Sequence, residues 1–201
     1  MKKTLLTIFA GISILSANAQ QDSIKLPFTQ DGRIEYTAVI QTPNLTVNQI
    51  YQNAKYFFRT GFKKADDVIT VDDTTAHIIA IKSKIFAPLK LDLPGSGGST
   101  TAGDMFDYLL TIEVKDGKYR YTISGFSGNT VSSGIYPGYQ TVSFDGTGAG
   151  KARTVYNTIK DEKLKKTLVR GTTDMLNYLN DKMTTLIASL NSNIAKSKSD
   201  F

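Results

Sequence analysis

The sequence predicts an α+β domain in which helices pack against a sheet that contains an antiparallel hairpin. Three observations predict it. An amphipathic helical period spans residues 45–62, an alternating strand–turn–strand pattern spans residues 106–123, and a second helical period runs toward the C-terminal end. The remaining apolar segments alternate as strands do, so the predicted order is strand, helix, four strands, helix.

The first predicted helix has recognisable start and stop signals. Thr46 and Gln49 have the spacing of a capping box, and Leu45 and Ile50 that of a hydrophobic staple. Gly61 suits the left-handed residue that ends a helix, with Phe62 beyond it folding back onto the helix. Its apolar stripe consists of Ile50, Tyr51, Ala54, Phe57 and Phe58. A stripe this aromatic predicts packing on a sheet face.

The strands are predicted from alternation and turn residues. A half-buried strand covers residues 33–40, a short β-branched strand residues 67–71, and a third strand residues 76–86. Residues 87–104 are rich in Gly, Pro and Ser, which predicts a long loop. Residues 125–150 are also rich in glycine and predict a second loop.

The hairpin is the clearest strand signal. Asp116-Gly117 lies between Lys115 and Lys118, which predicts a two-residue turn with positive φ angles. This turn would place Val114 opposite Tyr119 and Glu113 opposite Arg120, with apolar pairs on the inner face and the charged pair on the outer face.

The C-terminal part predicts either a helical arm followed by a long helix or one bent helix. Its apolar period begins at Val155, and Gly171 interrupts it at a cost of about 1 kcal/mol relative to Ala. Residues 193–201 are predicted to fray. Residues 33–192 are therefore predicted to form one domain.

The N-terminal residues resemble a signal peptide, residues 1–19. Lys2 and Lys3 precede a short apolar run, and Ala17-Asn18-Ala19 fits a cleavage site. A flexible lead-in, residues 20–32, would follow. The sequence contains no cysteine, so it has neither disulfides nor the cysteine of a lipoprotein. With no other long apolar run, we expect no transmembrane segment after signal cleavage and a soluble, exported protein, periplasmic or extracellular.

The pattern of elements resembles a known family. The helix containing Gln-Ile-Tyr and Ala-Lys-Tyr-Phe, and the hairpin Val-Lys-Asp-Gly-Lys-Tyr-Arg-Tyr-Thr, are similar to a bacterial exported domain of unknown function with a TATA-box-binding-protein-like (TBP-like) fold. The similarity covers residues 33–126 and a final helix. It implies a curved antiparallel sheet with helices on one face and no particular activity.

No catalytic motif is complete. The glycine-rich residues 146–151 fail as a phosphate loop, because Asp145 stands where the first glycine belongs and Ala152 follows the lysine. His77 is the only histidine and is predicted to lie on a sheet surface. The sequence therefore predicts no catalytic, cofactor-binding or metal-binding residues.

Two groups of charges have ordinary structural explanations. Asp66, Asp67, Asp72 and Asp73 are predicted to serve in turns, although paired carboxylates could bind Ca²⁺ or act as acid and base. Residues 160–170 form a basic run of mixed sign, which predicts a solvated helix face. Nucleic acid is not expected as a partner.

The favoured hypothesis is a non-enzymatic binding or scaffold domain of the bacterial cell envelope, with an envelope protein or glycan as its unknown partner. Its contact surface would be the uncovered sheet face, with Glu113, Arg120, Thr111 and Thr122, and the loop tyrosines Tyr136 and Tyr139. One alternative is an envelope or carbohydrate hydrolase that uses paired carboxylates, including Asp66, Asp72 and Asp104. A second is a small-molecule or lipid carrier with an apolar cavity.

Overall fold

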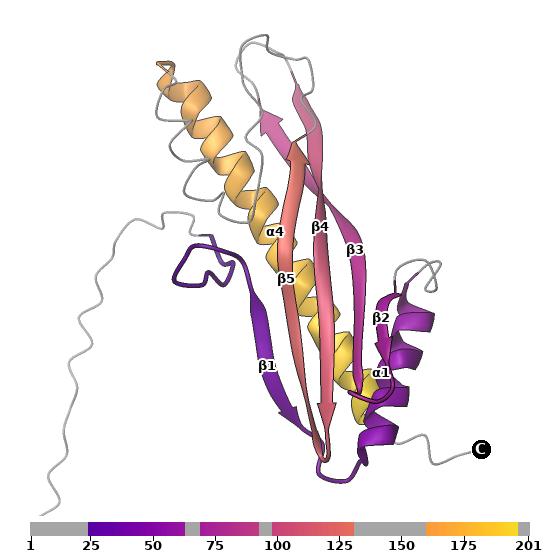
Figure 1. Ribbon diagram of the computed structural model, residues 1–201. Coiled ribbons are helices and arrows are strands. Elements are labelled where there is room, and N and C mark those ends of the chain that lie inside the picture. The colour runs from indigo at the N-terminus through magenta and orange to yellow at the C-terminus, as the bar shows by residue number, and fades with distance from the viewer. Residues whose placement is uncertain (1–23, 63–68, 93–97, 131–159, 197–201) are drawn as a thin grey trace, which may run out of the picture.

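A computed structural model of the chain describes residues 24–62, 69–92, 98–130 and 160–196 (Figure 1). The described elements are β1 (Tyr36–Gln41), α1 (Val47–Gly61), β2 (Ile69–Asp73), β3 (Ile78–Asp92), β4 (Ser99–Lys115), β5 (Lys118–Thr130) and α4 (Glu162–Ala195). The five strands form one antiparallel sheet in the order β1-β5-β4-β3-β2. The predicted order of strands and helices is confirmed.

One face of the sheet is covered by the helices. α4 runs behind the three long strands, and α1 lies beside β2 and the C-terminal end of α4 (Figure 1). Alternate residues of β4, from Phe106 to Val114, are buried in the same core as the apolar stripe of α1. We call the other side, where the intervening residues point, the open face of the sheet. No helix among the described residues is long and apolar enough to span a membrane.

The start of α1 is as the sequence predicts. The Thr46 hydroxyl accepts from the Gln49 backbone N–H, and the Gln49 side chain accepts from the Thr46 N–H, across 3.3 and 2.9 Å. The end differs from the prediction. Gly61 does not have a positive φ, because the helix ends at Phe62, which has an extended backbone. The Phe62 ring still folds back onto Phe57, with ring centroids 6.0 Å apart.

The hairpin has the predicted register. Glu113 pairs with Arg120 and Val114 with Tyr119. Only one of the two predicted positive φ angles is present, since Gly117 has φ +67° whereas Asp116 is not in the left-handed region. Glycine is needed at that single position. Further along, β5 contains a bulge at Gly125, also with positive φ, opposite the segment Asp107–Leu109 of β4.

The predicted loop at residues 87–104 is largely wrong. β3 continues to Asp92 and β4 begins at Ser99, and the two strands pair throughout. Pro88 is compatible with a strand here because β2 pairs with β3 only up to Ile81, so no strand among the described residues needs the missing N–H. Opposite Pro88, Gly103 lies beneath the Phe86 ring, which a Cβ would overlap. Of the predicted loop 125–150, residues 125–130 also belong to β5.

α4 is one helix of 34 residues, without a separate N-terminal arm among the described residues. Asp161 caps its start by accepting from the Lys163 and Leu164 N–H groups. Gly171 is buried against β3, and a Cβ there would come within 2.7 Å of Leu91 Cδ2. This glycine permits close packing of helix on strand. The predicted frayed tail begins too early, because Ile194 is fully buried.

Two tyrosine–asparagine hydrogen bonds connect α4 to β1 and β5. Tyr36 of β1 donates to Asn180 Oδ1 at 3.0 Å, and Tyr119 of β5 donates to Asn191 Oδ1 at 2.7 Å. Burial raises the pKa of both phenols well above the usual value, so both remain donors at all ordinary pH values. These polar contacts orient a helix whose other contacts are mostly apolar.

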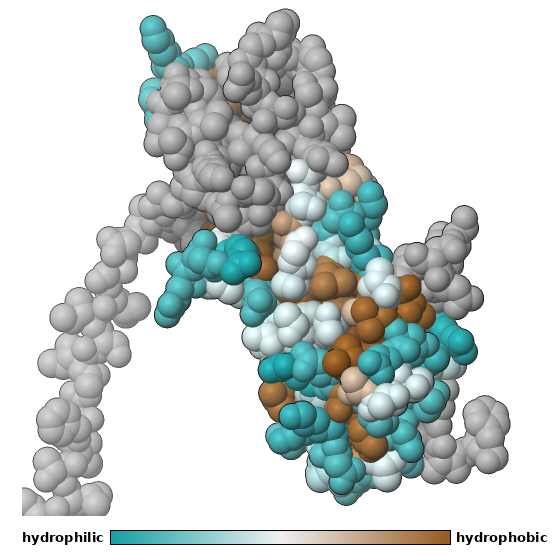
Figure 2. All heavy atoms as spheres, in the orientation of Figure 1, coloured by the Kyte–Doolittle hydropathy of each residue, from teal (hydrophilic) through white to brown (hydrophobic). Residues whose placement is uncertain are grey.

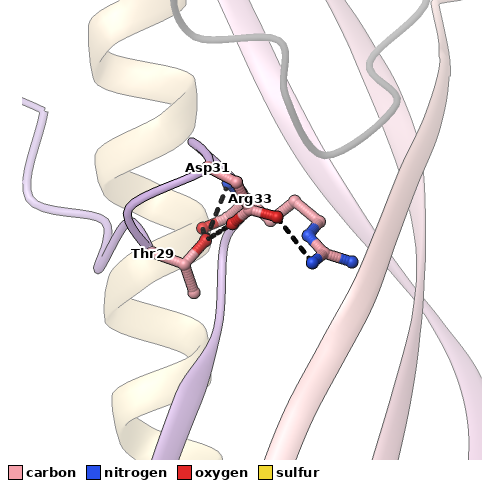
Figure 3. A network of polar contacts seen from close by, with 3 residues as sticks. All are labelled: Thr29, Asp31 and Arg33. Atoms are coloured by element: carbon pink, nitrogen blue, oxygen red, sulfur yellow. Dashed lines mark hydrogen bonds and ion pairs between the residues drawn. The ribbon is translucent and has the colours of Figure 1, made fainter.

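The segment before β1 is not the flexible lead-in that the sequence predicts, at least from residue 24 onward. Leu26 is buried, and Phe28 forms a β-bridge with Ile34. Within this turn the Asp31 carboxylate lies between the Thr29 hydroxyl and the Arg33 guanidinium (Figure 3). The Thr29 hydrogen bond and the Arg33 charge lower the pKa of Asp31.

Candidate functional site

The open face carries the two charged residues that the sequence predicts there. Arg120 of β5 and Glu113 of β4 form a cross-strand ion pair of 2.5 Å. Both side chains are accessible, at 52% and 36%. An exposed pair of this kind adds about 1 kcal/mol at most to stability. Its charges are held in place and remain accessible to a partner.

Hydroxyl groups form the adjacent row of the open face. Thr111, Thr122 and Thr37 lie side by side on β4, β5 and β1. The Thr37 and Thr122 hydroxyl oxygens are 3.3 Å apart, and Thr37 also donates to the Tyr121 carbonyl. The predicted outward orientation of Thr111 and Thr122 agrees with the strand register.

Exposed apolar side chains lie among these polar groups. Val39 is 55% and Phe86 is 50% exposed, and Val71, Met105 and Leu109 are each about two-fifths exposed. Figure 2 shows hydrophobic residues in a broken band over the strands, bordered by hydrophilic ones. Phe86 and Met105 are directly paired across β3 and β4. None of these five residues is predicted from the sequence as a contact residue, because the alternation of each strand identifies the inner residues that form the core.

A shallow hollow lies on the open face around the charged pair. The hollow measures about 180 Å³ and is bounded by the following residues: Val39, Glu113, Lys115, Lys118, Tyr119 and Arg120. Three of its four charged side chains are cationic. Such a hollow suits one side chain of a partner better than the enclosure of a small molecule.

The loop tyrosines of the predicted surface, Tyr136 and Tyr139, lie outside the described residues. The same is true of the signal peptide, of Asp66 and Asp67, and of the glycine-rich residues 146–151. Their predicted roles therefore stay predictions.

His77 lies in a turn, not within a strand as predicted. It immediately precedes β3 and has φ +54°, which is unusual for a residue with a side chain. Its ring meets Tyr51 edge-on, with centroids 5.7 Å apart, and its Nε2 lies 3.4 Å from Asn48 Oδ1. Among the described residues, no three His, Asp or Glu side chains are grouped to hold a metal ion.

The described carboxylates of the predicted acidic group have structural partners. Asp73 accepts from the Thr75 and Ala76 N–H groups at 2.9 and 2.8 Å, as expected of a turn residue. Asp72 accepts from the Tyr51 hydroxyl and pairs with Lys55 at 2.5 Å. Lys55 and Tyr51 lower the pKa of Asp72, so this carboxylate is a poor proton donor near neutral pH.

The basic run at the start of α4 is largely exposed, as predicted. Lys160, Lys163, Lys166 and Arg170 are accessible to solvent. Lys165 lies 3.6 Å from Glu162, and Arg170 lies 4.0 Å from Asp174. Such long, exposed ion pairs are typical of a solvated helix face.

Comparisons with known proteins agree with this architecture. Residues 36–129 match the family described as a domain of unknown function (DUF4468) with TBP-like fold. A crystal structure of a DUF4468 family protein from Bacteroides ovatus is similar, with TM-score 0.55 and 14% identity, over 88% of this chain and 94% of that one. A TBP-like protein from Parabacteroides distasonis has TM-score 0.46 and 12% identity, over 83% and 97% of the two chains. No curated protein matches the chain. Residues 36–129 are therefore similar to the DUF4468 family, whose fold is described as TBP-like.

Proposed function

We propose that the protein is a non-enzymatic binding or scaffold domain whose open sheet face contacts a partner protein. The observation that carries this proposal is the composition of that face. Exposed aromatic, Met and aliphatic side chains alternate there with the charged pairs Glu113–Arg120 and Lys84–Asp107, and aromatic residues, Met and Arg are enriched in protein–protein interfaces. Isolated exposed apolar residues are common, but five on one face of one sheet form a contact surface of the kind that binds a partner.

The described residues support a hydrolase or a carrier less well than they support a protein-binding domain. Asp72 is engaged by Tyr51 and Lys55 of α1, and Asp73 accepts from two backbone N–H groups of a turn. Phe57 and Phe58 fill the space between α1 and the sheet, which disfavours an enclosed carrier cavity at that place. A protein-binding role needs neither a carboxylate pair nor a cavity.

Site-specific photo-cross-linking in cells tests the proposal. A benzophenone side chain would replace Leu109 or Val39 on the open face, and Tyr56 on α1 would serve as the control. Tyr56 is 47% exposed, so its access to solvent is comparable. We expect one cross-linked species of the same mass from both open-face positions and none from Tyr56. Adducts from Tyr56 alone, or no adduct from either strand position, would refute the assignment.

We also propose that the chain acts in the cell envelope, with Gln20 as the first residue after signal cleavage. The support is the sequence alone: two lysines, a short apolar run and a small-x-small site. Mass spectrometry of the protein purified from its native cells provides the test. A mature chain that begins at Gln20 in the envelope fraction is expected, whereas full-length protein in the cytoplasm would contradict export.

A further inference from the structure

A second surface feature lies on the helix side of the molecule and reaches the β3 edge of the sheet. It is an open groove of about 360 Å³ between the end of α1, β3 and the middle of α4. Its apolar lining consists of Phe57, Phe62, Ile85, Tyr108, Met183 and Leu186. This volume falls within the range common for small-ligand sites.

Two cations flank this apolar groove. Lys84 of β3 and Lys182 of α4 both border it, and none of the described side chains that border it is acidic. Lys84 lies 3.4 Å from Asp107 on the open-face side of β3, but its side chain is 64% exposed, so the pair is weak and the ammonium group can turn across the strand edge toward the groove. The Lys182 ammonium lies over the Tyr178 ring at 5.2 Å, an interaction that leaves its donors available.

Three hydroxyl-bearing residues line the groove, Tyr108, Thr185 and Ser189, and two of them are already engaged. Tyr108 is buried and hydrogen-bonded to Ser83. The Thr185 hydroxyl at its border already donates to the Asp181 carbonyl at 2.8 Å. A peptide backbone buried there would leave donors and acceptors without partners, at a cost of about 1–3 kcal/mol each. An alkyl chain has no such groups. The apolar walls and the few free hydrogen-bonding groups therefore favour an alkyl chain, and the flanking cations favour an anionic head group.

We propose that this groove binds a single-chain alkyl carboxylate, with the chain against Phe57, Phe62 and Leu186 and the carboxylate between Lys84 and Lys182. This inference does not depend on the role of the open face. It differs from a carrier with an enclosed cavity beneath α1, because the ligand lies in a surface groove.

Calorimetric titration of the full chain with dodecanoate, below its critical micelle concentration, tests the proposal. The groove variant is Lys84→Gln/Lys182→Gln. The matched control, Lys82→Gln/Lys166→Gln, removes the same charge from exposed positions outside the groove. We expect binding to the unaltered protein, at least tenfold weaker binding to the groove variant, and less than a twofold change in the control. Dodecyltrimethylammonium, which has the opposite charge, should not bind.

A third variant, Leu186→Asn, tests the apolar wall separately. It should also weaken dodecanoate binding, with the fold checked by circular dichroism for each variant. Absence of dodecanoate binding to the unaltered protein would overturn the proposal. Equal weakening in the groove and control variants would overturn it too, since that outcome indicates only non-specific attraction to a basic protein. Neither result would bear on cross-linking at the open face.

Discussion

The Asn53 side-chain amide donates to the Ile194 carbonyl across 2.9 Å, so a buried residue of α1 caps the C-terminal end of α4. The same amide donates to the Lys196 carbonyl at 3.0 Å. The last carbonyls of a helix have no partner within the helix, and buried ones need a donor from elsewhere. Asn53 therefore joins two helices that are far apart in the sequence.

Replacement of Asn53 by Ala should destabilise the fold by roughly 1–3 kcal/mol, because it leaves buried carbonyls of α4 without a donor. Urea denaturation followed by circular dichroism measures the change. Gln52→Ala is the control, since Gln52 is the exposed neighbour on the same helix. Equal stability of the two variants would show that the cap contributes nothing.

Gly171→Ala and Gly61→Ala are the same substitution in two helices, but only Gly171→Ala should destabilise the protein. A Cβ at Gly171 would lie 2.7 Å from Leu91 Cδ2 and 2.8 Å from the Lys90 carbonyl oxygen. We expect this overpacking to cost about 1–3 kcal/mol, which outweighs the gain in helix propensity of about 1 kcal/mol. A Cβ at Gly61 would make only ordinary contact with Phe57, at 3.7 Å.

Thermal unfolding of both glycine variants checks this prediction. Gly61→Ala should leave the melting temperature unchanged or raise it, because alanine restricts the unfolded chain and Gly61 does not need a positive φ. Gly171→Ala should lower it. An increase at Gly171 would mean that α4 and the far half of β3 are not in close contact.

Asp72 should make the stability depend on pH in the acidic range. Lys55 and then Tyr51 lower its pKa in the folded protein relative to the ordinary value of 3.8. A carboxylate with a lowered folded pKa adds stability above its unfolded pKa, and that contribution is lost as the pH falls through the folded pKa. The free energy of unfolding should therefore decline below about pH 4 partly because of Asp72.

Urea denaturation at a series of pH values from neutral to acidic tests the role of Asp72. In Asp72→Asn the decline should be shallower, since residue 72 no longer titrates. Lys55→Gln should have a similar effect, because it removes the largest cause of the lowered pKa. Curves for both variants that run parallel to that of the unaltered protein would contradict the assignment.

Features set by nearby residues could be predicted from the sequence. The Thr46–Gln49 cap and the stripe of α1 depend on residues within a few turns of one another. The turn at Gly117 fixes the register of β4 and β5, and thereby the outward Glu113–Arg120 pair. Local spacing therefore predicted both the fold class and the two described charges of the candidate surface.

Features set by distant partners could not be predicted. Pro88 and Gly103 are loop signals on their own, and only their pairing across β3 and β4 makes them strand residues. Asn53 looks like a solvent-facing helix residue, because its partner Ile194 is 141 residues further along. The exposure of Phe86 and Leu109 likewise follows from which sheet face the helices cover, which no local pattern specifies.

Hydroxyl-radical footprinting of the protein in intact cells, compared with the purified protein, tests the central claim most directly. If the open face contacts a partner protein, oxidation of Met105 and Phe86 should fall at least severalfold in cells. Tyr56 on the helix side should be oxidised equally in both samples, and buried Met183 should remain unmodified in both. Equal oxidation of Met105 and Phe86 in cells and in the purified protein, with Tyr56 protected instead, would contradict the account.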